Sequence, residues 1–154
     1  MPPTTIRKQH SSPCSPGDAK AILDKGYAAG ALGKDAQAER ENRLATMASR
    51  QVSDDAKTLA QQESDAAKAA DGLAAEKLGE AYASYRQYEK AIAAYQQALQ
   101  KGGLEHGDDA KLHLGIAELT GGQEAKARET LNGVSGNDGT HALAQLWLIH
   151  GKAQ

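Results

Sequence analysis

The sequence predicts an all-α protein, built from stacked antiparallel helical hairpins and closed by a C-terminal capping helix. Three observations support this fold class. Apolar residues recur every three or four positions along most of the chain. Alanine, glutamine, glutamate and lysine, which favour helices, are abundant. Finally, a pattern of small and large residues on two consecutive segments returns later with the same internal spacing, which indicates an internal repeat.

The N-terminal region is expected to contain a disordered tail and then a helix. Residues 1–14 are rich in proline, serine and threonine and have only one large aliphatic residue, Ile6. They bury too little apolar surface to offset the entropy of ordering. A helix should start at residues 15–18, where a capping serine precedes proline, glycine and an acid. Gly30 and Gly33 are candidates for its end.

Residues 35–71 are expected to be helical, as one long helix or as two. The segment lacks proline and glycine, and its apolar residues step by three or four positions. We prefer two helices separated near Val52-Ser53. Ser53 followed by Asp54 and Asp55 is typical of a helix cap with first-turn acids. The region would then be a degenerate hairpin with a thin apolar face.

Residues 72–134 predict two further hairpins. The expected helices and turns are 73–85, Arg86-Gln87 and 88–101 in the first, and 108–120, Gly121-Gly122 and 123–133 in the second. Arg86 stands in its turn where Gly122 stands in the sister turn. If that position requires a left-handed backbone, Arg86 costs about 1 kcal/mol of stability.

A last helix is expected at residues 140–151, after a turn at 135–139. Leu143, Leu146, Trp147 and His150 fall on one stripe of this helix. We interpret it as the capping helix that a helical array needs at its end, with Trp147 as a packing residue.

The two hairpins at 72–134 share one set of signature positions. These are Leu78, Gly79, Tyr82, Ala91, Tyr95 and Ala98 in the first, and Leu114, Gly115, Ala127, Leu131 and Val134 in the second. The pattern resembles the tetratricopeptide repeat, which has L-G-x-x-Y on one helix and A-x-x-x-F on the next. Glu118 departs from it, because an aromatic residue is usual there. The chain is also similar to bacterial tetratricopeptide-repeat proteins of unassigned role.

The chemistry of the signature is packing. Gly79 and Gly115 would let the paired helix approach closely, and Ala91 and Ala127 would be the small residues that face them. No hairpin of this kind buries its apolar face alone, so neighbouring hairpins must stack.

The resemblance divides the chain into six segments. They are a disordered tail (1–14), the remnant second helix of a repeat (15–34), a degenerate helical hairpin (35–71), two tetratricopeptide repeats (72–105 and 106–139) and a capping helix (140–154). Because the remnant lacks a first helix, we expect the chain to start inside a longer array. One helix face would then be uncovered at the N-terminus, and a homo-oligomer formed through it is an alternative to a monomer.

The resemblance also implies a concave groove for a peptide or helix, lined by the first helices of the repeats. Carried onto this chain, the groove residues are Glu76, Glu80, Ala83, Leu112, Ile116 and Leu119. The alternative is that the three apolar residues of the second repeat simply pack against neighbours. Chaperone-binding relatives use Lys and Asn where Glu76 and Glu80 stand, so an acidic C-terminal tail is disfavoured as a ligand. A partner with apolar anchors and some Lys or Arg suits this face better.

The composition and motifs argue against several function classes. A formal net charge of −2 without a concentrated basic face gives no reason to expect nucleic acid. No apolar run reaches about 18 residues, so no membrane span is expected. The chain has no catalytic motif, its lone Cys14 has no positioned histidine, and its histidines lack metal-site spacing. We expect no enzyme activity, no cofactor and no metal site.

The sequence therefore predicts a protein-protein interaction module that binds a peptide or helix of an unknown partner. The alternative is a self-associating structural scaffold without a groove ligand. The chain shows no export signal. It would be periplasmic if it is a piece of an exported bacterial protein, and cytoplasmic otherwise.

Overall fold

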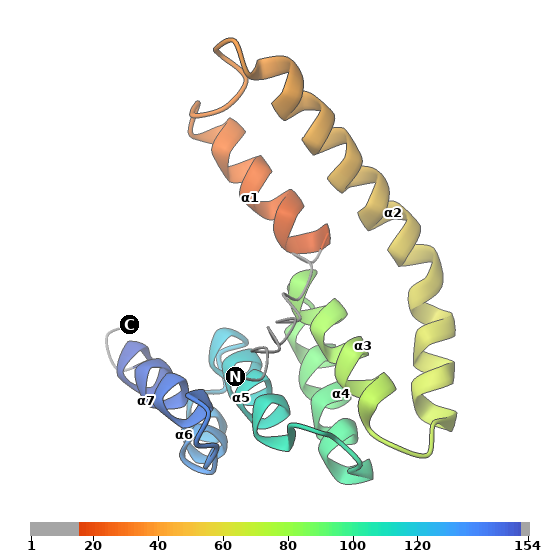
Figure 1. Ribbon diagram of the computed structural model, residues 1–154, viewed down its shortest axis with the longest axis vertical. Coiled ribbons are helices and arrows are strands. Elements are labelled where there is room, and N and C mark those ends of the chain that lie inside the picture. Colours follow the sequence, from red (N-terminus) through yellow and green to blue (C-terminus); the bar gives the residue numbers. More distant parts are fainter. Residues whose placement is uncertain (1–15, 152–154) are drawn as a thin grey trace, which may run out of the picture.

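The computed structural model describes residues 16–151, which consist of α-helices joined by turns and loops (Figure 1). The helices are α1 Pro16–Ala28, α2 Ala38–Lys68, α3 Leu73–Ser84, α4 Tyr88–Lys101, α5 Gly107–Thr120, α6 Glu124–Asn132 and α7 Thr140–His150. No strand occurs in these residues, so the predicted all-α class is confirmed. The predicted tail at 1–14, the cap at Ser15 and the end of the last segment, 152–154, lie outside the described residues.

The hairpin predicted within residues 35–71 is wrong, because α2 is one continuous helix of 31 residues that passes through Val52-Ser53. The acids that suggested a helix cap have other partners. Asp54 pairs with Lys57 at 2.8 Å on the same helix. Asp55 accepts a 2.8 Å hydrogen bond from the hydroxyl of Tyr85, at the end of α3. These contacts, together with the lack of glycine and proline, allow the helix to continue.

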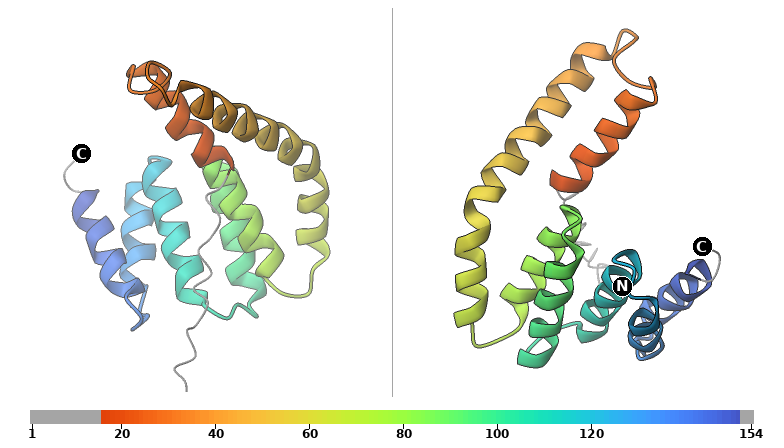
Figure 2. Two further views of the ribbon diagram at one scale, coloured as in Figure 1. Left: turned by 45° about the horizontal axis from the view of Figure 1, so that its top comes forward. Right: turned by 180° about the vertical axis from the view of Figure 1, so that it is seen from behind.

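The helix α2 is long enough to support two shorter helices placed end to end (Figures 1 and 2). Its first half packs antiparallel to α1, and its second half packs against α3, where the hydroxyl of Tyr82 donates to Glu63. The start of α1 meets the end of α3, since a β-carbon on Gly17 would lie 2.5 Å from the carbonyl oxygen of Ser84. The N-terminal hairpin is therefore α1 with α2, and not a break inside α2.

The end of α2 is held by a lysine from α4. Nζ of Lys101 donates to the carbonyl oxygens of Ala66, Ala67 and Ala69 at 2.7, 3.0 and 2.6 Å. A cation at this end complements the negative pole of the helix dipole and satisfies carbonyl groups that have no partner within the helix.

The two predicted hairpins, α3–α4 and α5–α6, are built on the same close contact. A β-carbon on Gly79 would lie 2.7 Å from the ring of Tyr95. A β-carbon on Gly115 would lie 2.6 Å from the side chain of Leu131. Gly79 and Gly115 are 36 residues apart (115 − 79), and so are Tyr95 and Leu131 (131 − 95). The repeat in the sequence is thus a repeat in the contact between helices.

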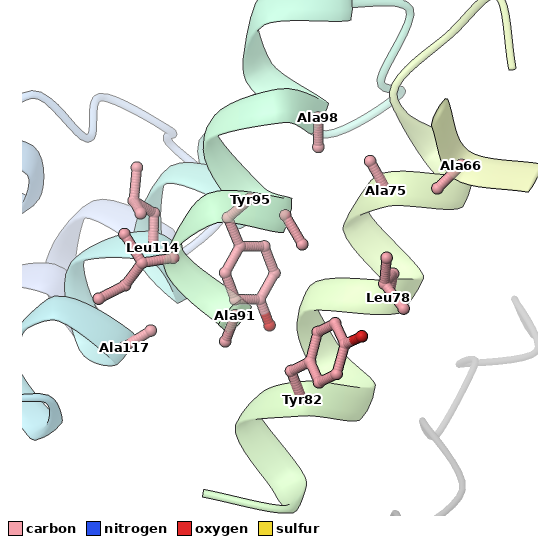
Figure 3. Packing of buried hydrophobic residues seen from close by; sticks show 11 residues of the cluster. Ala66, Ala75, Leu78, Tyr82, Ala91, Tyr95, Ala98, Leu114 and Ala117 are labelled. Carbon is pink, nitrogen blue, oxygen red and sulfur yellow. The ribbon is translucent and has the colours of Figure 1, made fainter. Parts of the chain in front are cut away.

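The buried apolar residues form two clusters. The first joins α2, α3, α4 and α5 (Figure 3) and contains Ala66, Ala75, Leu78, Tyr82, Ala91, Ile92, Ala94, Tyr95, Ala98, Leu114 and Ala117. The second joins α5, α6 and α7 and contains Leu112, Leu131, Val134 and Ala144. Because alanine makes up much of the first cluster and buries little area, its helices must pack at short range.

The turns of the two hairpins share a left-handed residue. Arg86 has φ of 58°, and Gly122 has φ of 82°. The backbone N–H of the next residue, Gln87 or Gln123, donates to the preceding helix at 2.9 or 2.8 Å. Arg86 is the only non-glycine residue with positive φ in the described range, so the expected strain at this position is present.

Replacement of Gly79 by leucine should lower the free energy of unfolding by about 1–3 kcal/mol, because the new side chain overpacks against Tyr95. Gly107→Leu is the matched control, since nothing lies within 4 Å of a β-carbon there. Chemical denaturation of both variants measures the difference. Equal stability of the two variants would contradict the close contact between α3 and α4.

Replacement of Arg86 by glycine should raise the free energy of unfolding by about 1 kcal/mol, because glycine adopts positive φ without a steric penalty. The reciprocal variant Gly122→Arg should lose a similar amount. Thermal unfolding followed by circular dichroism would measure both. A shift of the same sign in both variants would argue against backbone strain as the cause.

Candidate functional site

The six predicted groove residues separate into two groups in the structure. Glu76 and Glu80 of α3 lie at the surface, the first half-buried and the second exposed, while Ala83 packs on the first core cluster. The apolar residues of α5 lie against α7 instead. They comprise Leu112, which is 4% exposed, Ile116, which packs in the second cluster, and Leu119, which lies against Gly151.

The apolar part of the predicted groove is therefore covered by a neighbouring helix, as the alternative interpretation had it. Ile116 packs with Trp147 and Leu148 of α7 in the second cluster. Trp147 also stacks edge-on against His150, with ring centroids 5.6 Å apart. On α5, the partly buried Asp109 remains near Glu76 of α3.

Three carboxylates from two hairpins form what we call the acidic face: Glu76 and Glu80 of α3 and Asp109 of α5. Burial and the negative charges of Glu80 and Asp109 raise the pKa of Glu76 above its ordinary value. Glu76 and Glu80 are also one helical turn apart, a spacing at which like charges repel. Among residues 16–151, none of the three carboxylates forms an ion pair with Lys or Arg. His106 and Lys77 lower the pKa of Glu76, but by less than burial and the two negative charges raise it.

The floor of the acidic face is the ring of Tyr95 from α4. Tyr95 is 2% exposed. Its burial, and after that the charges of Glu80 and Glu76, raise the pKa of its hydroxyl. The ring lies 5.9 Å from the ring of His113 on α5, whose buried Nδ1 has no hydrogen-bond partner among the described residues. Three consecutive helices thus contribute to one surface.

An apolar residue extends the acidic face along α3. Leu73 is 48% exposed and precedes Glu76 by three residues and Glu80 by seven, so all three side chains share one side of the helix. The N-terminus of α7 fixes the opposite edge, where the hydroxyl of Thr140 donates to Asp109 at 2.9 Å.

Sequence reasoning missed Leu73, Asp109 and His113 as members of this surface. From the sequence, Asp109 was interpreted only as an acid that stabilises the first turn of a helix, and it does lie in the first turn of α5. Its proximity to Glu76 arises only when α5 stacks on α4. The one available signal was that Asp109 and Leu73 occupy the same position in the two repeats, 36 residues apart (109 − 73).

Comparisons with family models, with curated proteins and with solved structures find no match for this chain. No described helix is both long and apolar enough to cross a membrane. Residues 16–151 also contain no group of three or more His, Cys, Asp or Glu side chains arranged to hold a metal ion.

Replacement of Glu76 by glutamine should stabilise the protein at neutral pH. A raised pKa means that the ionised carboxylate destabilises the folded state, and this penalty is full above the folded-state pKa. The gain should be about 0.2–0.5 kcal/mol at pH 7, the magnitude for a like-charged pair one turn apart. It should shrink as the pH falls through the raised folded-state pKa and vanish below the ordinary value of 4.5.

Thermal unfolding of wild type and variant between pH 4 and pH 7 measures this effect. Glu129→Gln, at an exposed position of α6, is the control for loss of one negative charge. A stability gain that is equal at both pH values, or equal in the control, would contradict repulsion within the acidic face.

Proposed function

We propose that this chain is a protein-interaction module of the tetratricopeptide-repeat type, which binds a partner segment carrying Lys or Arg on the acidic face. The observation that carries the proposal is that Glu80 and Asp109 lie close enough to Glu76 to raise its pKa, with Glu76 and Glu80 beside the buried ring of Tyr95. The repulsion between these carboxylates lowers the free energy of unfolding. Surface clusters that destabilise the folded protein in this way are frequently functional sites.

The chemistry of the surface favours a basic ligand. A guanidinium or ammonium group placed between Glu76 and Glu80 would remove their mutual repulsion and gain charge-assisted hydrogen bonds. Leu73 offers an apolar contact one turn away, so a segment with one apolar and one or two basic residues fits best. An acidic segment would bring like charges together and is disfavoured.

The repeated helix pairing supports the same class of function. The contacts of Gly79 with Tyr95 and of Gly115 with Leu131 give two hairpins of similar geometry. Stacked hairpins of this kind present side chains of successive first helices on one extended surface. Here α3 and α5 are those helices, and both contribute to the acidic face.

The alternative function, a self-associating scaffold, is favoured by a different surface. Ile22 of α1 and Leu44 and Met47 of α2 are 66%, 46% and 60% exposed. They lie on the N-terminal hairpin, where an uncovered face was expected from the sequence. If the apparent mass of the wild-type protein in solution rises with concentration and that of Met47→Glu does not, this alternative is favoured.

The double charge reversal Glu76→Lys/Glu80→Lys should weaken binding of an Arg- and Leu-containing peptide by at least about tenfold, or about 1.4 kcal/mol. Fluorescence polarisation with labelled peptides of about 12 residues measures the affinity, which should also fall with added salt. The same peptide with Glu in place of Arg should not bind the wild-type protein through this face.

The matched control is Glu89→Lys/Glu129→Lys, which changes the net charge by the same amount at exposed positions of α4 and α6. Used in a pull-down from the source cell lysate, the same pair of variants would identify a natural partner. If both double variants lose affinity equally, the effect is one of net charge and the acidic face is not the binding site.

A further inference from the structure

The helix α7 leaves an apolar face exposed at the C-terminal side of the stack. It covers α5 and α6 with Thr140, Ala144, Trp147 and Leu148. Beside these contacts, Leu143, Leu146 and Ile149 are 45%, 61% and 64% exposed. A shallow hollow on this face is lined by Leu143, Leu146, Trp147 and His150.

The position of α7 in the stack indicates what is missing from this face. α7 contacts α6 and α5, just as α5 contacts α4 and α3. On α3 and α5, the side bearing Gly79 or Gly115 is covered by the next helix in the chain. Among residues 16–151, no helix covers the side of α7 that carries Leu143, Leu146 and Ile149. A terminal helix with a polar outer side needs no cover, whereas the exposed side of α7 carries Leu143, Leu146 and Ile149 among its polar residues.

We propose that a second copy of this chain occupies the open place, with α7 packed antiparallel to α7 of the other copy about a two-fold axis. The stripe Leu143, Leu146, Trp147 and His150 is symmetric in its spacing, with gaps of three, one and three residues. An axis near Leu146 and Trp147 therefore places Leu143 opposite His150 of the other copy and Leu146 opposite Trp147. The exposed Leu146 would then enter the hollow beside it, as a self-complementary contact requires.

The absence of charged residues on α7 is compatible with packing against α7 of a second copy. Residues 140–150 contain no Asp, Glu, Lys or Arg. Two copies can therefore meet along this helix without burying an unpaired carboxylate, ammonium or guanidinium group. The antiparallel direction also places the two helix dipoles in opposite orientations.

The size of the face sets the strength of the pairing. The 11 residues of α7 span about 16 Å. A face of this length buries a few hundred Å² per copy, less than the roughly 800 Å² per partner of a standard stable interface. The dimer should therefore be weak and form only at high protein concentration. This surface is separate from the acidic face, so either can exist without the other.

Sedimentation velocity from about 5 µM to about 1 mM should show monomer giving way to dimer. Trp147 is the only tryptophan, so its fluorescence should shift to shorter wavelength over the same range. Leu146→Glu and Leu146→Lys should each remain monomeric, whereas their equimolar mixture should recover the dimer through opposite charges at the axis. Leu146 is 61% exposed, so circular dichroism should show an unchanged helix content.

Met47→Glu is the control, because it places the same charge on an exposed residue at the other end of the stack and should leave the dimer intact. A wild-type chain that stays monomeric at about 1 mM would overturn the proposal and leave the face to a different partner. Failure of the mixed variants to associate, or loss of the dimer in Met47→Glu, would also overturn it.

Discussion

Gly79 lies against the ring of Tyr95, and Gly115 lies against Leu131 in the same way. These contacts set the distance between the paired helices, and the rest of the stack depends on that distance. Much of the first core cluster is alanine, whose small side chains gain little from burial unless the helices are close. A wider pair would also move the surface that α4 presents to α5, so each close contact supports the packing of the next hairpin.

The acidic face is a consequence of the same stacking. Asp109 comes near Glu76 because α5 packs on α4. The ring of Tyr95 lies close to Glu76 and Glu80 because it fills the space beside Gly79. One tyrosine therefore serves the core and also forms the floor of a charged surface. The ring must stay buried for the hairpin to pack, whereas the carboxylates near it repel one another and lower stability. The charges proposed to bind a partner therefore destabilise the same region that the ring stabilises.

The two ends of the stack are built differently. At the N-terminal side, α2 continues past α3 to hold α1, and Lys101 and the hydroxyls of Tyr82 and Tyr85 fix α2 to the repeats. At the C-terminal side, α7 has no helix beside its apolar stripe within the described residues. The first end is tied by polar contacts, whereas the second end remains open to association.

The sequence alone determined the helices and turns between residues 72 and 134, because glycine, alanine and large residues repeat there at fixed spacing. It also singled out Arg86 as the residue that would be strained if its turn were left-handed, and the structure shows that it is. Only the tertiary structure decided the course of α2 and the membership of the acidic face. Ser53, Asp54 and Asp55 carry a local cap signal, but Asp55 finds its partner in Tyr85, which is 30 residues away. In the same way, Leu112 has the pattern of a groove residue and is buried by α7. Local patterns fix local backbone geometry, whereas partners that are distant in the sequence are chosen by packing.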